Sequence, residues 1–390
     1  MILHQLILAD TGQAVNISVN DGKIDKITSG AITDHTTALQ LHFDDAIISP
    51  GLINSHDHLD FNLFPQLGNR VYKNYTEWGA YIHQQFKHEI AEVLQVPIQL
   101  RILWGIYKNL LCGVTTVVNH GKRLTIEDSP ITVYEDTHDL HSAAFEKAWK
   151  LKLNNPLKKN VPVVIHTGEG TDEAASDEID QLIYWNKLRR HLIGIHAVAM
   201  TAAQANSFKG LVWCPESNYF LLNKTAPVKE LKQHTRIMFG TDSTLTGNWN
   251  IWDHINMAHK TELLTDKELY QSLNINAAKV WGLNTGEIAE GKDADLVIGR
   301  RKEGVTSLDA FYAITPVDLL LVIHQGNIRL FDQELLPPLA PHLKGREFSL
   351  IKISNGYKYV DGNLDALTEQ IKAVLPGFVF PVEVIDHQIL

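Results

Sequence analysis

Two histidines separated by a single residue, His56 and His58, have the spacing of metal ligands. If this segment is an extended strand, both imidazoles point to one face and can reach one ion, while Asp57 points away. Imidazole nitrogens are ligands that zinc and ferrous iron accept. Because the chain contains 19 histidines, one such pair could arise by chance. The surrounding sequence therefore has to decide whether the pair matters.

Further polar residues of metal-binding or acid–base type follow short apolar runs. The runs include CGVTTVVNH, VPVVIHTG, LIGIHAVAM, KGLVWCP and RIMFGTDS, and segments of helical composition, such as residues 98–111 and 179–191, separate most of them. Alternation of buried strands with helices favours a parallel α/β sheet. In an eightfold barrel, reactive side chains lie at the C-terminal ends of the strands. We therefore predict a (β/α)8 TIM-type barrel that gathers the following residues at one end: His56, His120, His166, His196, Glu216 and Asp242.

The segments on either side of this region predict a second structural unit. Residues 1–49 and 285–340 contain strand-like alternation and hairpin turn residues but few reactive side chains. We expect the metal-dependent barrel to occupy residues 50–284 and the flanking segments to form one small β-domain built from both chain ends. Residues 341–390 form a C-terminal extension whose packing the sequence leaves open, with a helix expected at 364–375.

Composition narrows the classes of partner. The net charge of −10 gives no support to nucleic-acid binding, which usually needs a basic face. No apolar stretch is long enough to span a bilayer. Two cysteines, Cys112 and Cys214, argue against a disulfide framework and are typical of a reducing compartment. We expect a cytoplasmic protein that binds a small-molecule substrate, with no nucleic-acid or membrane partner. A homodimer is one candidate oligomeric state.

The sequence around the first two histidines, SPGLINSHDHLD, resembles the first-strand signature of the amidohydrolase superfamily. The resemblance continues in order through HTGEG, LIGIHAVAM, CPESNYFLLNKTAPVKEL and FGTDS, and it covers roughly residues 45–300. HTGEG matches the His-x-x-Glu pattern of the mononuclear deaminase and chlorohydrolase branch. That branch includes guanine deaminase, cytosine deaminase and triazine hydrolases. The shared order of these segments makes the resemblance specific.

By this resemblance, one divalent transition metal ion is bound by His56, His58, His166 and Asp242, and His196 binds or orients the attacking water. Zinc is the first expectation and iron is the alternative, since imidazoles and a carboxylate suit both. An all-oxygen set for calcium or magnesium is absent from these segments. A divalent ion lowers the pKa of bound water towards neutrality. Asp242 can also accept a proton from that water.

Glu169, the glutamate of His-x-x-Glu, is implied to carry protons between water and substrate. The alternative is structural, because Glu169, Asp172 or Glu173 could cap the helix expected after Gly170. We prefer the catalytic role because a metal site is expected beside His166.

Four other polar residues have weaker claims to function. Asn218 follows the seventh strand, where the resemblance implies substrate contact, and a turn role is equally open. His120 ends an apolar strand and could bind substrate at the pocket mouth or be structural. His138 and His141 lie three residues apart, which we interpret as a helix terminus rather than a second metal site.

The implied function is hydrolytic deamination of an amino-substituted heterocycle by metal-activated water. Catalysis is assigned to Glu169, His196 and Asp242, and substrate binding to Asn218 and His120. One alternative is a hydrolase of cyclic amides or N-acyl C–N bonds with two metals. Such sites usually need a bridging carboxylated lysine or carboxylate on strand four, and the sequence offers no well-placed candidate. The other alternative, a non-catalytic barrel that binds a small molecule, conflicts with retention of the whole ligand set.

Overall fold

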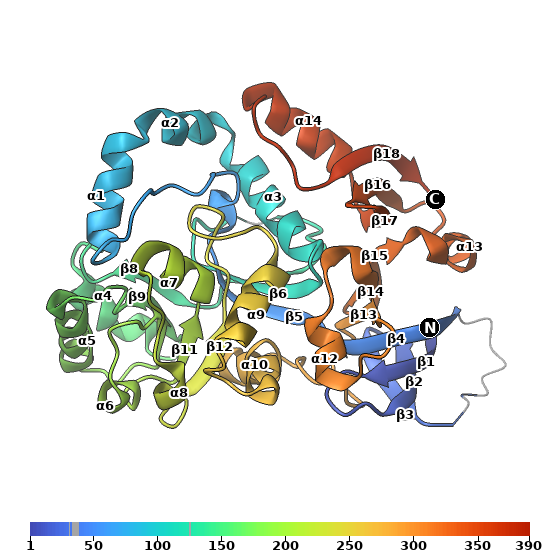
Figure 1. The fold of residues 1–390 in the computed structure, drawn as a ribbon, viewed down its shortest axis with the longest axis horizontal. Coiled ribbons are helices and arrows are strands. Elements are labelled where there is room, and N and C mark those ends of the chain that lie inside the picture. Colours follow the sequence, from blue (N-terminus) through green and yellow to red (C-terminus); the bar gives the residue numbers. More distant parts are fainter. Residues whose placement is uncertain (31, 33–38, 125) are drawn as a thin grey trace.

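One part of the molecule, on the left in Figure 1, consists of short parallel strands with helices between them. The computed structural model describes residues 1–390 except residues 31, 33–38 and 125. The parallel strands form a five-stranded sheet of order β12-β11-β10-β9-β8 and a three-stranded sheet of order β5-β6-β7. Their bounds are β5 (Leu52–Asp57), β6 (Val114–Asn119), β7 (Thr132–Tyr134), β8 (His138–Ser142), β9 (Val163–Thr167), β10 (Leu192–His196), β11 (Gly210–Trp213) and β12 (Arg236–Phe239).

The two parallel sheets meet where β5 lies beside β12. Asp57 and Asp242 form a parallel bridge, and the amides of Thr241 and Asp242 donate to the carbonyl of His56 at 3.1 and 3.0 Å. Within the described residues, no ladder joins the opposite edges, β7 and β8. The predicted α/β class with parallel strands is therefore confirmed, whereas closure into an eight-stranded barrel stays a prediction.

Helices follow most of the parallel strands. The segment predicted at 98–111 is α3, but the helix predicted around 179–191 begins earlier, because Asp172 caps it by accepting from the amide of Ala175 at 3.1 Å. In the part of the chain described, no helix combines the length and apolarity needed to cross a membrane. The helices of this region are α1 (Tyr75–Gln85), α2 (Lys87–Gln95), α3 (Ile98–Leu110), α4 (Trp149–Leu153), α5 (Glu173–Trp185), α6 (Ala202–Ala205), α7 (Pro215–Leu222), α8 (Val228–Leu231), α9 (Ile251–Lys260), α10 (Asp266–Ser272) and α11 (Ile275–Trp281).

Apolar side chains pack together on the inner side of the parallel strands, below the site. Branched side chains of neighbouring strands, among them Ile53, Val118, Val164 and Ile193, form one buried cluster with α11. β-branched residues suit such strands because they pack well on a pleated surface. The cluster fills the space under the strand ends, so polar side chains gather at the C-terminal ends.

The expectation that His138 and His141 mark a helix terminus is wrong. Both residues lie in β8, which pairs in parallel with β9 through His138 opposite Val163 and Leu140 opposite Ile165. A spacing of three residues is compatible with either a helix or a strand, and the ladder with β9 is a tertiary contact that local sequence does not encode.

A ten-stranded sheet gathers strands from both ends of the chain, in the order β18-β16-β17-β15-β14-β13-β4-β1-β2-β3. Strand β4 pairs with β1 in parallel and with β13 in the antiparallel sense, which joins the two ends. The helix expected at 364–375 is α14 (Leu364–Val374). The strands are β1 (Ile2–Leu8), β2 (Ala14–Asn20), β3 (Lys23–Thr28), β4 (Gln40–Pro50), β13 (Leu296–Arg300), β14 (Leu319–His324), β15 (Asn327–Asp332), β16 (Glu347–Ile353), β17 (Gly356–Asp361) and β18 (Glu383–Ile389), with α12 (Ser307–Tyr312) and α13 (Leu336–Leu339) between them.

Candidate active site

Three histidine side chains converge at the C-terminal ends of β5 and β9. The Nε2 atom of His166 lies 3.3 Å from that of His56 and 3.3 Å from that of His58. Asp242, just beyond β12, places Oδ1 at 3.6 Å from Nε2 of His56 and 3.7 Å from Nε2 of His58. All four side chains are buried. The structure thus brings together the residues that the sequence assigns to a metal ion.

The protonation of His166 leaves its Nε2 without a hydrogen. Its Nδ1 lies 2.7 Å from the carbonyl oxygen of His141, and a carbonyl can only accept, so Nδ1 carries the proton. Lone pairs on neighbouring ring nitrogens repel each other unless a cation lies between them. A tetrahedral ion with bonds of about 2.0–2.1 Å separates its ligands by about 3.3 Å. The residues present therefore fit one divalent transition metal ion.

Electrostatics keep these ligands in the state that a metal needs. Burial, helped by neighbouring histidines, lowers the pKa of His58 to about 3 and that of His166 well below its ordinary value. Burial raises the pKa of Asp242, but the hydrogen bond and charge of His56 and the charge of His58 outweigh it and hold that pKa low. His58 and His166 are thus neutral and Asp242 is ionised at neutral pH, as metal binding requires.

Asp242 is held by two hydroxyl groups that the sequence analysis missed. Ser217 Oγ and Thr246 Oγ1 each donate to Oδ2 at 2.8 Å, which leaves Oδ1 towards the histidines. Ser217 belongs to α7 and Thr246 to the loop after β12, so no local pattern connects them to Asp242. The sequence signal is weak, because serine and threonine are common in such segments.

His196, at the end of β10, is oriented by Asn218. Its Nδ1 lies 2.9 Å from Asn218 Oδ1, and the amide group of Asn218 donates in turn to Thr225 Oγ1 at 3.2 Å. Nε2 of His196 therefore faces the cluster, 3.5 Å from Oε1 of Glu169. Burial lowers the pKa of His196 to about 4, so this ring is neutral. Asn218 lies in α7 behind His196, so it is not a turn residue and does not line the cavity.

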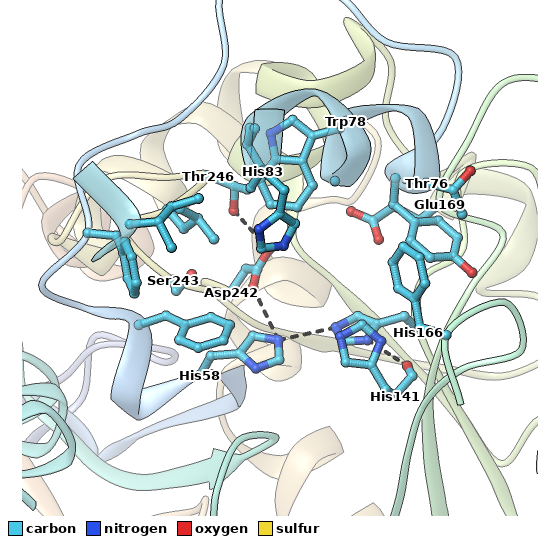
Figure 2. A pocket seen from close by; sticks show the side chains of 18 of the residues that line it. His58, Thr76, Trp78, His83, His141, His166, Glu169, Asp242, Ser243 and Thr246 are labelled. Carbon is cyan, nitrogen blue, oxygen red and sulfur yellow. Dashed lines mark hydrogen bonds and ion pairs between the residues drawn. The ribbon is translucent and has the colours of Figure 1, made fainter. Parts of the chain in front are cut away.

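Glu169 projects into the cavity from the turn after β9 (Figure 2). Its side chain is buried, and this burial, together with the charges of Asp242 and Glu178, raises its pKa well above the ordinary value. The capping role considered for Glu169 belongs to Asp172, whose side chain caps α5. Gly168 has φ +62, a left-handed conformation that glycine adopts readily and that turns the chain after β9 towards Glu169.

His120 lies behind the metal ligands, not at the pocket mouth as expected. Its ring centroid is 4.6 Å from that of His166 and 5.3 Å from that of His56. It is buried, and its ring nitrogens have no hydrogen-bond partner among the described residues. The cavity lining does not include His120. The apolar strand before it carries the residue inward, beneath the ligands, which explains the difference.

A cavity of about 520 Å³ opens above the cluster. Its floor carries the metal-type side chains, and Figure 2 shows His58, His166 and Asp242 on this side, with Glu169 and His83 higher and Trp78 above them. The other described lining residues are Phe61, Phe64, Tyr75, Thr76, Gly79, Ala80, Ile82, Ile90, Leu94, His141, Phe145, His196, Ser243, Leu245 and Thr246.

A second polar network, on the opposite face of β5, was also missed. Asp57 lies between the two ligand histidines and points away from the cavity, as expected. Its Oδ2 accepts from Lys108 Nζ at 2.9 Å and Asn109 Nδ2 at 2.8 Å, and its Oδ1 accepts from Asn62 Nδ2 at 2.8 Å. Lys108 is 1% exposed. A lysine in a helix is usually solvated, so its sequence gives no sign of this burial.

Comparison with known proteins finds likeness to one family model and to several deaminases. Residues 150–329 match the amidohydrolase family model. A 5'-deoxyadenosine deaminase from Methanococcus maripaludis is 27% identical over 231 residues, 49% of this chain and about half (54%) of that relative. Its counterpart from Methanocaldococcus jannaschii is 23% identical over 411 aligned residues, 86% of this chain and 96% of the relative. The fold is shared with an adenosine deaminase from Xanthomonas campestris solved with bound zinc, at TM-score 0.70 and 17% identity, over 96% of this chain and 98% of that one.

Proposed function

We propose that this chain, which carries an amidohydrolase domain in residues 150–329, catalyses hydrolytic deamination of a small amino-substituted heterocycle. The observation that carries the proposal is the placement of Glu169. Its buried carboxyl group, with a raised pKa, lies in the same cavity as the cluster of three histidines and Asp242. A carboxyl group that can hold a proton beside a site for activated water is the pairing that deamination needs.

We assign one divalent ion to His56, His58, His166 and Asp242, with zinc first and iron as the alternative. The nitrogen and oxygen donor set supports a transition metal, and the related adenosine deaminase from Xanthomonas campestris was solved with zinc. When bound, the ion supplies Lewis acidity and a water molecule of lowered pKa. Because His58 and His166 are already neutral, metal binding does not have to displace protons from them.

The remaining steps belong to side chains of this chain. Asp242 accepts a proton from the attacking water, whose oxygen bonds to the ring carbon that bears the amino group. Glu169 gives its proton to the adjacent ring nitrogen. The ionised Glu169 then takes the remaining proton from the new hydroxyl group and passes it to the amino group, so that the C–N bond breaks, the C=O bond forms and ammonia leaves. The proton on Asp242 returns to Glu169 and completes the cycle. His196, fixed through Nδ1 by Asn218, directs Nε2 at the oxygen and orients it. Asn218 is thus a positioning residue.

The cyclic-amide hydrolase is less well supported. Its second metal would need a lysine or carboxylate on β8 that faces the histidines. The carboxylate on this strand, Asp139, is bonded to Arg123 at 2.5 Å and to Thr137 at 2.7 Å. It is held away from the cluster, although its Oδ1 lies 3.7 Å from His120 Nδ1. No lysine occurs within β8.

We also propose a division of the chain into domains. The barrel would occupy residues 50–284, and residues 1–49 and 285–340 would form one small β-domain. The ten-stranded sheet supports this division, since strands of both flanking segments share it. Residues 341–390 would belong to the same unit, because β16, β17 and β18 extend that sheet. The two free, buried cysteines, Cys112 and Cys214, support a cytoplasmic location.

The test is a screen of the metal-reconstituted protein against aminopurines, aminopyrimidines and aminotriazines, with ammonia release as the readout. We expect one of these classes to release ammonia, and chelation to abolish the release. Cyclic amides and N-acyl amines serve as the comparison set. Turnover confined to that set, or ammonia release that survives complete removal of the metal, would contradict the proposal.

A further inference from the structure

The cavity wall that faces the metal cluster from above is apolar. It is formed by α1 and α2, by the segment after β5 and by side chains from two other loops. Among the described residues that line the cavity there is no lysine and no arginine, and the carboxylates are Glu169 and Asp242. The apolar side chains of the wall are Phe61, Phe64, Trp78, Ile82, Ile90, Leu94, Phe145 and Leu245.

The polar groups of this wall already donate their hydrogens to the protein. The indole nitrogen of Trp78 donates to the carbonyl of Leu67 at 2.7 Å. The hydroxyl of Thr76 donates to Asn74 Oδ1 at 2.7 Å. The hydroxyl of Tyr75 donates to a glutamate of α5 at 2.8 Å. A substrate that lies against the wall therefore meets carbon atoms and few available donors.

Besides the metal-type and acid–base side chains, three lining residues keep free polar atoms. Among the described residues, no side-chain hydrogen bond forms at His83 or Ser243, and the His141 ring is bonded only through Nδ1, to Ser142 Oγ at 3.3 Å. Figure 2 shows the His83 ring pointing from α1 into the cavity above Asp242. The His141 ring is 5.0 Å from that of His166, on the floor. His83 lies above Asp242, and Ser243 follows Asp242 in the chain, so both are close to the place where the ring of a heterocycle would sit. They can bind ring atoms, but they leave the upper wall without a polar partner for a substituent.

From this arrangement we infer that the substrate is a neutral amino-heterocycle with an apolar substituent, which packs against Trp78, Leu94 and Phe145. The inference rests on the proposed function and adds the class of substituent. Burial of an apolar group against this wall is favourable, because it removes carbon surface from water. A charged or hydroxylated tail gains nothing there, because Leu94 and Phe145, each 51% exposed, offer its polar groups no partner in exchange for the water that they displace.

This substituent differs from those that the names of the sequence relatives would suggest. The relatives named 5'-deoxyadenosine deaminase take their names from a nucleoside, and a ribose carries hydroxyl groups. The wall described here offers such hydroxyls no free donor among Tyr75, Thr76 and Trp78. We therefore expect this chain to prefer an apolar substituent on the ring over a sugar.

Binding to the metal-loaded Glu169→Gln variant tests the inference without turnover. Calorimetric titration would compare three probes that share the adenine ring system and differ in its substituent: 9-benzyladenine, 5'-deoxyadenosine and S-adenosylhomocysteine. We expect 9-benzyladenine to bind about tenfold or more tightly than either of the others, which is about 1.4 kcal/mol. If it binds no more tightly, or if none of the three binds, the inference is wrong. Tight binding of 9-benzyladenine with no ammonia release by the wild type would instead contradict the proposed function.

A variant of the wall provides the second arm of the experiment. Leu94 lies in the last turn of α2 and is 51% exposed, so Leu94→Arg is compatible with folding. The new cation should shift the ratio of the dissociation constants by about threefold or more towards the carboxylate-bearing S-adenosylhomocysteine. Leu157→Arg, at a position 92% exposed and outside the cavity, is the matched control and should leave the ratio unchanged. An unchanged ratio in Leu94→Arg, or equal shifts in both variants, would overturn the inference.

Discussion

The two faces of β5 differ in how their buried polar groups are satisfied. On one face, His56 and His58 direct Nε2 at His166 and the ionised Asp242, and no cationic side chain of the described residues lies between them. On the other face, the carboxylate of Asp57 is satisfied by Lys108 and three asparagines. The protein alone completes the second face, whereas the first needs an ion. Incomplete satisfaction of buried polar groups thus marks the functional face of the strand.

The largest expected effect is the loss of metal at the face of β5 that carries His56 and His58. Asp242→Ala removes the one anionic ligand and leaves the three histidines without charge compensation for a divalent ion. Wild-type protein should carry about one transition-metal ion per chain, and this variant should lose most of it. Elemental analysis after gentle purification measures both.

Asp44→Ala is the control for that measurement, because Asp44 is exposed and lies in β4, within the ten-stranded sheet. It should keep the metal. About two ions per wild-type chain would favour the dinuclear alternative, and full metal retention in Asp242→Ala would remove that residue from the ligand set.

On the face of β5 that carries Asp57, replacement of Lys108 should lower the stability of the protein. Lys108→Met leaves the charge of Asp57 buried and unpaired, so the free energy of unfolding should fall by about 3–5 kcal/mol. Adding Asp57→Asn to Lys108→Met should recover part of this loss, because the amide carries no charge. Urea denaturation of metal-free protein gives these values.

Lys260→Met is the matched control, since Lys260 is an exposed lysine at the end of α9. It should change stability little. An equally stable Lys108→Met protein would mean that Asp57 does not depend on its cation, and the contrast between the two faces would disappear.

A smaller effect should come from Glu178, a half-buried glutamate with no cation bonded to it among the described residues. Burial raises its pKa from 4.5 to about 7, and the Tyr75 hydroxyl donates to Oε2 at 2.8 Å. Because the folded-state pKa is the higher one, stability is greatest below pH 4.5 and falls as the pH rises towards and through 7. Glu178→Gln keeps an acceptor for Tyr75 and removes the charge.

The free energy of unfolding of Glu178→Gln should therefore exceed that of wild type by about 1–2 kcal/mol at about pH 8, and by less at about pH 5. Denaturation of metal-free protein at the two pH values checks the sign. A gain that is independent of pH would show that the charge of Glu178 is not what destabilises the wild type.

The sequence predicted the floor of the cavity much better than its wall. The spacing of His56 and His58, together with the order of the later segments, led to residues that the structure indeed brings together, although their roles remain proposals. Side chains that converge from strand ends follow a rule of parallel α/β architecture. The apolar wall follows no such rule, because α1 and α2 reach the site only through the path of a long connection after β5.

The errors have a common cause. Asn218 was expected near substrate and His120 at the pocket mouth, but Asn218 supports His196 from behind and His120 lies beneath the ligands. Sequence position fixes the strand end to which a residue belongs, but not the depth at which its side chain points. Ser217 and Thr246 were missed for the same reason, since their bonds to Asp242 are tertiary contacts.

The most direct test of the central claim is the turnover of Glu169→Gln, assayed with the heterocycle from which the wild type releases most ammonia. The amide introduced by this substitution is nearly isosteric with the carboxyl group but cannot carry a proton at neutral pH. Because Glu169 is not a ligand in this scheme, metal content and melting temperature should stay close to those of the wild type. Turnover should fall by about 10²-fold or more. A folded, metal-loaded Glu169→Gln enzyme with wild-type turnover would contradict the account.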